Sequence, residues 1–349
     1  MILPAFINYA ALATLRCGII SNRYGRTARL IAMVPSDGHC EEKNNQDRFN
    51  AMEHRNWEQG FEAYDQGFGP LTRQPIPTLL AHANFPPDDG DGRTICRLLD
   101  VATGPGFVLS AAINSALSTD EKRQQSFQLT GLDITKNFLS LAEQRISLQL
   151  QQDQQQSEKI TVDFVEGSAE SLPFSDEIFD SIICNFGILH FFSPESFLRE
   201  SYRVLRPGGK VSFTAWAPPT RTEGFRIARE SIAEAGNPNV VGLPEGPNFF
   251  DFGCSGHAMT VLKSIGFEKV DSVELSEMKW LNVKNGQMLH DVLLNGTSRT
   301  REVLLGQTQE EGCAVQSLMA KKYDSTTDGG KMPLSMPAVV TSGQKPFSS

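Results

Sequence analysis

The sequence predicts an α/β protein built on a mostly parallel β-sheet that helices cover on both faces. Short apolar runs alternate with helical patterns, and glycine-containing turns separate several of them. The apolar runs are nearly continuous, as in strands buried on both faces. The 349 residues suffice for one large domain with additions. Ligands of such sheets bind at the carboxyl ends of the strands.

The first half of the predicted sheet follows directly from this alternation. Residues 94–101 form an apolar run, a Gly-Pro-Gly turn follows, and the Ala-rich segment 107–117 predicts a helix. After the next run, 127–132, Thr135 can cap a helix that reaches about residue 150. Further strands are predicted at 160–165, 179–185 and 210–216, and a helix at 194–205.

The second half is less regular. A helix is expected at 223–235, followed by a loop rich in glycine and proline up to residue 256. Apolar residues at 268–275 and 278–283 predict an antiparallel hairpin at the edge of the sheet, and 286–320 predicts one or two helices.

Composition divides the chain into four predicted parts. They are an N-terminal extension at 1–44, a helical lid at 45–92, the α/β domain at 93–320 with an insertion at 217–256 that covers a substrate pocket, and a disordered tail at 321–349. The tail is rich in Ser, Thr, Gly, Pro and Lys, with little periodic apolar content.

The N-terminal extension has two readings. Its first 36 residues contain four arginines and no Asp or Glu. An apolar, arginine-bearing, acid-free start is typical of a mitochondrial transit peptide, but also occurs in weakly ordered extensions. The sequence therefore predicts a cytoplasmic protein, with a mitochondrial location as the alternative.

Charge, hydropathy and cysteine spacing exclude several classes. The formal net charge of -9 argues against a protein that grips nucleic-acid phosphates. No apolar run approaches the roughly 18 residues of a membrane-spanning helix. The six cysteines form no CxxC pair and show no metal-ligand spacing with histidine, so neither a metal site nor a disulfide scaffold is predicted.

The turn after the first strand is the first candidate binding element. Residues 100–106 read Asp-Val-Ala-Thr-Gly-Pro-Gly, and Gly104 and Gly106 remove side chains where a ligand can approach the backbone. A third glycine does not follow, which departs from the dinucleotide fingerprint. The sequence thus favours a ligand without a pyrophosphate, although such a turn can also be a plain connection.

An acidic residue ends the second strand. Asp133 can accept hydrogen bonds from two ribose hydroxyls, because both its carboxylate oxygens are acceptors. The alternative is a charge that stabilises the amino end of the following helix. Its order after the glycine turn favours the ribose role.

These residues together resemble the class I S-adenosylmethionine-dependent methyltransferases. The segment 98–106, Leu-Leu-Asp-Val-Ala-Thr-Gly-Pro-Gly, is similar to motif I of the family, and Asp133 matches its ribose-binding acid. Similar segments follow in family order at 166–174, 179–190 and 203–210. The resemblance covers about 93–216 and is greatest to the branch of ubiquinone and menaquinone biosynthesis. It implies a Rossmann-like seven-stranded sheet, parallel with one antiparallel edge strand.

The resemblance also implies S-adenosylmethionine as cofactor. The Gly104–Gly106 turn would hold its methionine part, Asp100 would anchor that turn and attract the ammonium, and Asp133 would hold the ribose. Ile134 and Phe186 would sandwich the adenine. The cofactor-binding residues expected in this way are Tyr64, Asp100, Ala102, Gly104, Pro105, Gly106, Asp133, Ile134, Ser168, Ala169, Asn185 and Phe186.

Three of these residues have qualified roles. Ala102 stands where the family usually has its first glycine, and Ser168 where it has an Asp that contacts adenine. The Ala169 N–H can take over that contact. Tyr64 is similar to a tyrosine that reaches the cofactor from the lid, and a plain packing role is equally open.

His190 is the candidate catalytic residue. It follows the fourth strand, and imidazole suits proton removal at neutral pH. The alternative is a histidine packed between Leu189 and Phe191. Aromatic residues of the insertion and its neighbours, Trp216, Phe249, Phe250, Phe252 and Trp280, could line an acceptor cavity or simply pack the core of the lid.

The predicted function is methyl transfer to a small, apolar or aromatic metabolite in biosynthesis, either of a quinone precursor or of a specialised metabolite. Partners other than this small molecule are not predicted, with no nucleic acid and no membrane span, and the sequence leaves the oligomeric state open. Two alternatives share the fold. One binds the cofactor but catalyses a rearrangement or cyclisation, and the other is a non-catalytic interaction protein.

Overall fold

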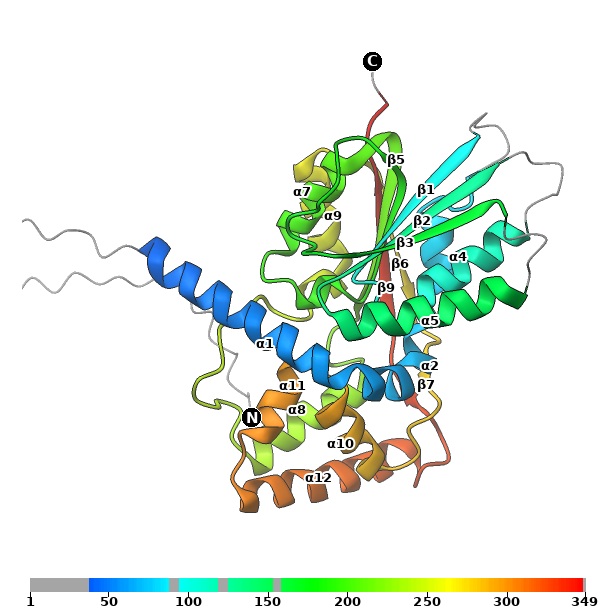
Figure 1. Cartoon of the computed structure of the whole chain (residues 1–349). Helices are drawn as coiled ribbons and strands as arrows, with labels where there is room; N and C mark the ends of the chain where they lie inside the picture. The colour runs from blue at the N-terminus through cyan, green and yellow to red at the C-terminus, as the bar shows by residue number, and fades with distance from the viewer. Residues whose placement is uncertain (1–37, 88–93, 119–124, 153–157, 348–349) are drawn as a thin grey trace, which may run out of the picture. The chain divides into compact units, whose positions relative to one another are not determined.

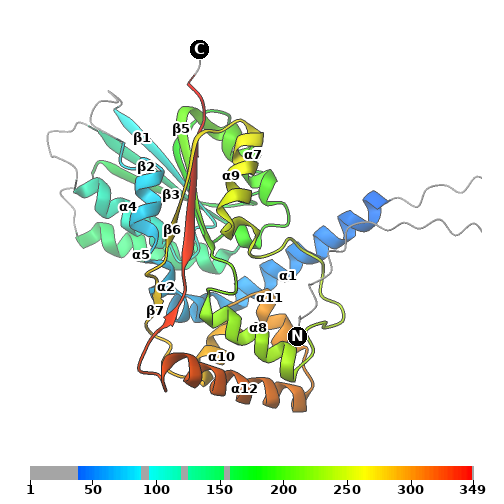
Figure 2. The same cartoon turned by 180° about the vertical axis from the view of Figure 1, so that it is seen from behind.

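A seven-stranded mixed sheet runs through the protein, with the strand order β3-β2-β1-β4-β5-β9-β6 (Figures 1 and 2). The computed structural model describes residues 38–87, 94–118, 125–152 and 158–347. The predictions for residues 1–36 lie outside this described part. Residues from His39 onward form one compact unit.

The first five strands are parallel and close to their predicted positions. They are β1 (Ile95–Val101), β2 (Ser126–Asp133), β3 (Ile160–Glu166), β4 (Phe179–Asn185) and β5 (Leu205–Trp216). In β4 every residue except Asn185 is buried, including the polar Asp180 and Ser181, as in a strand covered on both faces. The predicted α/β class and its Rossmann-like, seven-stranded sheet are therefore confirmed.

Helices cover both faces of the sheet. On one face lie α3 (Ile76–His82), α4 (Phe107–Leu117) and α5 (Lys136–Gln152), and on the other lie α7 (Pro194–Val204) and α9 (Ser255–Ile265). The sequence sets the start of α7 clearly: Pro194 occupies the first turn and the Ser193 hydroxyl accepts a hydrogen bond from the Ser196 N–H.

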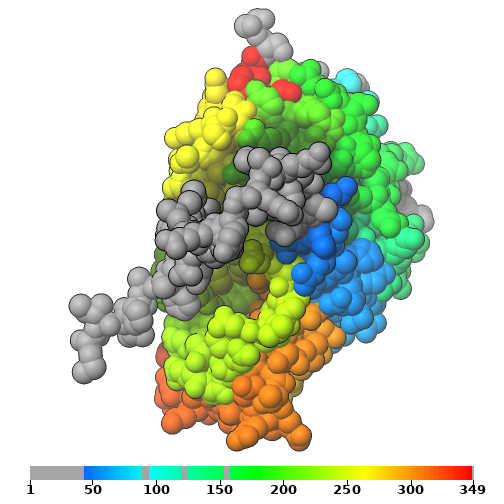
Figure 3. Space-filling model, turned by 90° about the vertical axis from the view of Figure 1, so that its left-hand side faces the viewer, coloured from blue at the N-terminus to red at the C-terminus, as the bar shows by residue number. Residues whose placement is uncertain are grey.

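A third layer of helices stands at the end of the sheet where the parallel strands finish (Figures 1 and 2). It consists of α8 (Glu223–Ala235), α10 (Gly286–Asn295), α11 (Arg299–Leu305) and α12 (Gln309–Thr327). The long α1 (Gly38–Gly67) lies between this layer and the sheet (Figure 1), and Figure 3 shows its blue surface between green and orange parts of the chain. It continues through α2 (Gly69–Thr72) into α3, so the N-terminal helices join the helical layer to the sheet.

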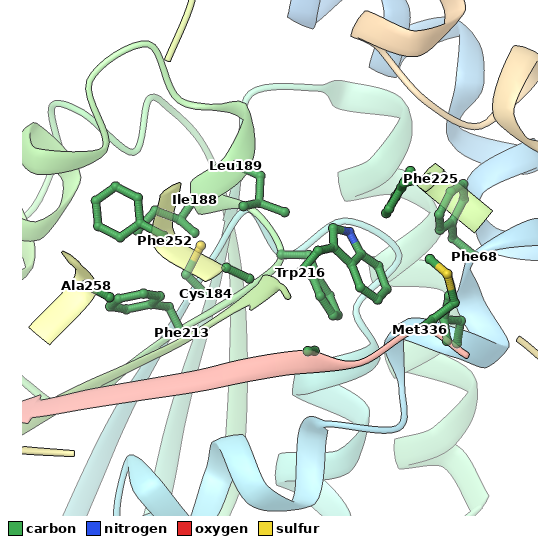
Figure 4. Close-up of a cluster of buried hydrophobic side chains, with 14 of the residues drawn as sticks. Phe68, Cys184, Ile188, Leu189, Phe213, Trp216, Phe225, Phe252, Ala258 and Met336 are labelled. Carbon is green, nitrogen blue, oxygen red and sulfur yellow. The ribbon is translucent and has the colours of Figure 1, made fainter. Parts of the chain in front are cut away.

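Aromatic side chains connect the sheet with the helical layer. Figure 4 shows Trp216, at the end of β5, between the sheet residue Phe213 on one side and Phe225 of α8 and Phe68, which precedes α2, on the other. The Trp216 and Phe225 ring centroids are 5.6 Å apart, and those of Phe68 and Trp280 are 4.7 Å apart. Trp216 and Trp280 are almost fully buried, as is Phe252 in the turn Asp251–Gly253. These three side chains belong to the core, which agrees with the packing role and not with an open acceptor cavity.

The prediction of a disordered tail at 321–349 is wrong. Helix α12 continues to Thr327, and residues Ala338–Gln344 form β9, all seven of them buried. The strand β9 pairs antiparallel with both β5 and β6 (Glu268–Leu275). Its Ser, Thr and Gly content is typical of a tail, but Thr341 Oγ1 lies 3.0 Å from Ser272 Oγ across the strands. Paired backbone and hydroxyl groups make this polar segment suitable for the interior.

Of the predicted edge hairpin, the strand at 268–275 is confirmed as β6, but the strand at 278–283 is wrong. The antiparallel strand β9 lies one position in from the edge, and β6 is the edge strand. Of the segment 278–283, only β7 (Lys279–Trp280) is a strand, and it pairs with β8 (Leu334–Ser335) in a separate two-stranded sheet. The Trp280 indole donates a hydrogen bond to the Gly67 carbonyl 3.0 Å away. This contact and burial draw the segment away from the main sheet.

A truncation tests the role of β9. Ending the chain after Asp328 removes the strand between β5 and β6 and leaves their backbone groups unpaired, which costs far more than the few kcal/mol by which domains are stable. We expect loss of the cooperative thermal transition followed by circular dichroism. A matched truncation that removes only residues 346–349 keeps β9 and should retain the transition. Folding of the shorter chain would contradict the assignment.

Candidate functional site

The carboxyl ends of β1 and β2 meet through the turn that follows β1. The Gly104 N–H donates to Asp133 Oδ2 at 2.9 Å, and the Thr103 N–H donates to the Leu132 carbonyl at 3.0 Å. The parallel register pairs Asp100 with Gly131 and Val101 with Leu132, so both strands end at the same level. The predicted turn and the predicted acid are thus brought together.

The two glycines of the turn have different roles. Both have positive φ, +50° at Gly104 and +78° at Gly106. A Cβ added to Gly104 would have only the Ala102 carbonyl oxygen within 4 Å, at 4.0 Å, so the space beside it is open. A Cβ on Gly106 would lie 3.0 Å from the Ala142 Cβ. Gly104 therefore leaves room for a ligand, and Gly106 lets the turn pack on α5. Pro105, between them, is buried, and its carbonyl accepts a hydrogen bond from Arg145.

Asp133 is buried and held on both oxygens. Besides Gly104, its Oδ1 accepts hydrogen bonds from the Thr135 N–H at 3.0 Å and the Thr135 hydroxyl at 2.8 Å. Burial raises the pKa of Asp133, and the hydrogen bonds from Gly104 and Thr135 oppose that shift. The Thr135 side chain was expected to cap α5, and in the structure it orients the Asp133 carboxylate. The proposed ribose contact uses the remaining acceptor capacity of the two oxygens.

Asp100 has one buried carboxylate oxygen without a hydrogen-bond partner among the described residues. Its Oδ2 accepts a hydrogen bond from the Thr103 hydroxyl at 2.6 Å, but its Oδ1 is buried and has no partner. Burial raises the pKa of Asp100 from 3.8 to about 8, the Thr103 hydroxyl opposes this and the Asp133 carboxylate adds to it. A buried acceptor without a donor is costly, and a cation beside it would remove that cost.

The end of β3 lies next to Asp133. The Gly167 N–H donates to the Asp133 carbonyl at 2.9 Å, Ser168 is exposed, and its Oγ accepts from the Glu170 N–H at 3.2 Å. Ile134 is partly buried, and the Ala169 side chain is in the core. Ile134 and Ser168 are therefore the members of this group that keep solvent-accessible surface. Their contacts with adenine stay predictions.

Asn185 and Phe186 join the sheet to the N-terminal helices. The Asn185 amide donates to the Thr72 carbonyl at 2.8 Å and its Oδ1 accepts from the Thr214 hydroxyl at 2.7 Å. Phe186 has a φ of +59° and stacks on Trp216 with a 4.0 Å centroid distance. Because this stacking and burial engage the Phe186 ring, the partly exposed Ile134 is the better placed of the two predicted adenine contacts.

Helix α1 places aromatic residues beside this edge. Tyr64 packs edge-on against Trp57 at 5.5 Å and stacks on Phe68 at 5.7 Å. Burial raises the pKa of Tyr64 to about 12, with a hydrogen bond to Thr72 opposing it and the Asp133 carboxylate adding to it. Tyr64 therefore packs among aromatic residues and also lies near Asp133.

His190 contacts α1 directly, which the sequence did not reveal. Its Nδ1 lies 3.2 Å from Glu53 Oε2, and its ring lies 4.8 Å from that of Trp57 and 5.6 Å from that of Phe249. Glu53 is buried on α1 in a row with Phe49, Met52 and Asn56. An acid among the apolar positions of a helical pattern was the signal that could have singled it out.

The pH dependence of stability tests Asp100. A carboxyl whose pKa rises on folding stabilises the folded state below its unfolded pKa, and this stabilisation is lost as the pH rises through about 8. The free energy of unfolding of the ligand-free protein should therefore fall between pH 5 and pH 8. In Asp100→Asn this fall should be smaller, because the amide resembles the protonated carboxyl. Urea unfolding at both pH values measures it.

The control for this test is Asp163→Asn, which changes an exposed carboxylate on β3. The fall of the free energy between pH 5 and pH 8 should be the same in this variant as in the unmodified protein. An equal fall in Asp100→Asn would contradict the assignment.

A pair of substitutions tests the packing at the edge. Ala102 has a φ of +54°, a conformation that costs alanine about 1–2 kcal/mol. A Cβ on Gly187 would lie 2.5 Å from the Ala102 Cβ and 2.8 Å from Cys184 Sγ. Gly187→Ala should destabilise the protein by about 1–3 kcal/mol. In thermal melts the double variant with Ala102→Gly should be more stable than the sum of the two single-variant changes indicates, whereas additive changes would contradict direct contact.

Comparison with known proteins agrees with this geometry. Residues 99–213 match the family model described as "Methyltransferase domain". The chain is 32% identical over 123 residues to a ubiquinone/menaquinone biosynthesis C-methyltransferase UbiE of Geotalea daltonii, covering 35% of this chain and 46% of that protein. It is 34% identical over 130 residues to a demethylmenaquinone methyltransferase of Oceanobacillus iheyensis, covering 37% and 48%.

Residues 99–213, about a third of this chain, are thus similar to the methyltransferase domain. The chain spans less than half the length of these curated relatives. Among solved structures, the Haemonchus contortus phosphoethanolamine N-methyltransferase 2 in complex with S-adenosyl-L-methionine is 18% identical, with a TM-score of 0.46, covering 85% of this chain and 60% of that one.

The residues present fit the S-adenosylmethionine of this family. The open space beside Gly104, the buried unpaired Asp100 Oδ1 and the Asp133 carboxylate all lie at one edge of the sheet. A positively charged ammonium suits the first two and hydroxyls suit the third. Within the described residues no group of His, Cys, Asp and Glu could hold a metal ion, and no helix has the length and hydropathy to cross a membrane.

Proposed function

We propose that this protein transfers the methyl group of S-adenosylmethionine to a small, apolar or aromatic acceptor. The proposal rests on the observation that two groups of residues lie next to each other. The edge formed by Asp100, Gly104 and Asp133 suits the cofactor, and through Tyr64 and Trp57 of α1 it adjoins the aromatic surroundings of His190.

The nature of the acceptor follows from those surroundings. Phe249 lies beside His190, and Phe250 packs edge-on against Phe249 at 5.0 Å. Both side chains are only partly buried, unlike Trp216 and Trp280 in the core. Partly buried aromatic rings next to one titratable group are typical of a pocket for a small apolar or aromatic molecule.

The chain's own residues position the reactants and exclude water. Bound S-adenosylmethionine supplies an already activated methyl group, so correct placement of the acceptor accounts for much of the rate enhancement. Asp133 and the turn at Gly104 would fix the cofactor. Helix α1 would close over both reactants, since Asn137 on α5 donates to the Glu58 carbonyl at 3.0 Å and Arg145 pairs with Asp65 at 2.8 Å.

We also propose a reducing, cytoplasmic setting. Among the described cysteines, Cys184, Cys254 and Cys313 take part in no disulfide. The mitochondrial alternative depends on the residues before 37 and stays a prediction from sequence. Thermal melts of the full chain with and without reductant test the setting, and a large loss of stability under reductant would contradict it.

Calorimetric titration with S-adenosylmethionine, S-adenosylhomocysteine and NAD tests the proposal. The first two should bind and NAD should not. Asp133→Ala should weaken binding of S-adenosylmethionine at least about tenfold, because hydrogen bonds to a charged group are worth about 1.5–3 kcal/mol. Acceptors are then screened by mass spectrometry for the gain of one methyl group.

Thr135→Val is the matched control for Asp133→Ala. It removes the hydroxyl that donates to Asp133 Oδ1 but keeps the carboxylate. We expect a loss of stability of about 1 kcal/mol with affinity nearly unchanged. Equal affinity in Asp133→Ala would contradict the ribose contact, and cofactor binding without any methylated product would favour a rearrangement or cyclisation.

A further inference from the structure

A buried acid on α1 contacts the histidine at the end of β4. Glu53 Oε2 lies 3.2 Å from His190 Nδ1 and 2.8 Å from the Trp57 indole nitrogen. The Glu53 side chain is 4% exposed and that of His190 is 23% exposed. The acid is therefore enclosed, while the imidazole stays accessible.

The groups around Glu53 bear on which ring nitrogen of His190 carries the hydrogen. Indole N–H can only donate, so Glu53 Oε2 is an acceptor in this cluster. Within the described part of the chain no lysine or arginine forms an ion pair with Glu53. With the Glu53 carboxylate as acceptor, the contact at 3.2 Å is a hydrogen bond when His190 carries its hydrogen on Nδ1, which leaves the lone pair of the neutral ring on Nε2.

The position of the pair relates it to the cofactor edge. Trp57 and His190 both contact Glu53 Oε2, and Trp57 packs against Tyr64. Tyr64 lies close enough to Asp133 for the Asp133 carboxylate to raise the pKa of Tyr64. The turn that carries His190 begins at Gly187, whose Cα packs on Ala102. His190 also packs edge-on against Phe249, with ring centroids 5.6 Å apart. The imidazole thus lies between the cofactor edge and the aromatic residues of the insertion.

We propose that Glu53 is a positioning residue that holds His190 as a base with a free Nε2, and that the acceptor carries an ionisable hydroxyl. This inference rests on the proposed function and adds the chemical class of the acceptor. A neutral amine has its own lone pair and attacks without prior loss of a proton. A hydroxyl attacks well only as its proton leaves, which is the task that a histidine held by a carboxylate performs.

The step balances in atoms and charge. The hydroxyl proton passes to His190 Nε2, and the acceptor oxygen forms a bond to the methyl carbon. The C–S bond that breaks leaves its electron pair on sulfur, so the sulfonium charge disappears. The new positive charge is on the imidazolium, which faces the Glu53 carboxylate.

The tautomer of His190 gives a test without cofactor or acceptor. Nitrogen-15 shifts of the imidazole in the full-length protein should show the hydrogen on Nδ1. Glu53→Met keeps the length of the side chain but removes the acceptor, and the hydrogen should move largely to Nε2. Glu53→Gln can still accept from Nδ1 and should keep the tautomer. Glu62→Gln, an exposed acid on the same helix, is the control and should change nothing.

Two results of this measurement would overturn the proposal. One is an Nε2–H tautomer in the unmodified protein, and the other is an unchanged tautomer in Glu53→Met. Thermal melts of each variant show whether it is folded. Neither the nitrogen-15 spectra nor the thermal melts need S-adenosylmethionine. Failure of the methyl-transfer proposal is therefore recognised separately, by the absence of cofactor binding.

Kinetics test the acceptor class. Release of S-adenosylhomocysteine is followed with a panel of phenols and a matched panel of anilines. With phenols as acceptors, His190→Ala should lower kcat about 100-fold and Glu53→Gln at least about tenfold, with little change in KM. With anilines the same variants should lose less than about threefold. Equal losses on both panels, or activity on anilines alone, would overturn the hydroxyl assignment.

Discussion

The hydrogen bonds of the Asp133 carboxylate are the constraint on which the candidate site depends. One oxygen holds the Gly104 N–H of the turn after β1, and the other holds the backbone and hydroxyl of Thr135 at the start of α5. A single buried acid thus sets the distance between two strand ends and the direction of a helix. Its burial is tolerated because each oxygen has a donor, whereas Asp100 beside it keeps one oxygen without a partner.

Helix α1 adds the second half of the site from outside the segment that matches the methyltransferase family. It brings Glu53 and Trp57 to His190 and Tyr64 to the cofactor edge. Its contacts reach the helical layer as well, where Arg55 pairs with Glu302 and Asn56 lies against Ser298. One continuous helix therefore supports both His190 and the cofactor edge, while the strand ends carry His190, Gly104 and Asp133 themselves.

Local pattern was sufficient for the five parallel strands, their helices and the turn at 100–106, because each is encoded by neighbouring residues: apolar runs, a proline and serine at the start of α7, glycines where φ is positive. It was insufficient for contacts between distant parts of the chain. Strand β9 mixes three apolar residues with Thr, Ser, Gly and Gln, and is recognisable only by its partners β5 and β6. Glu53 is one acid among many until the fold places it 3.2 Å from His190.

The place of β9 in the sheet has a consequence for synthesis. Strands β5 and β6 leave the ribosome well before residues 338–344, yet neither pairs with the other. Until β9 arrives, the nascent chain has one open edge on a largely apolar sheet and one strand without any neighbour, which is the kind of surface that chaperones hold and that aggregates recruit. Completion of the sheet is thus delayed until residues 338–344 have been made, and a chain stalled before β9 would present that edge to other chains.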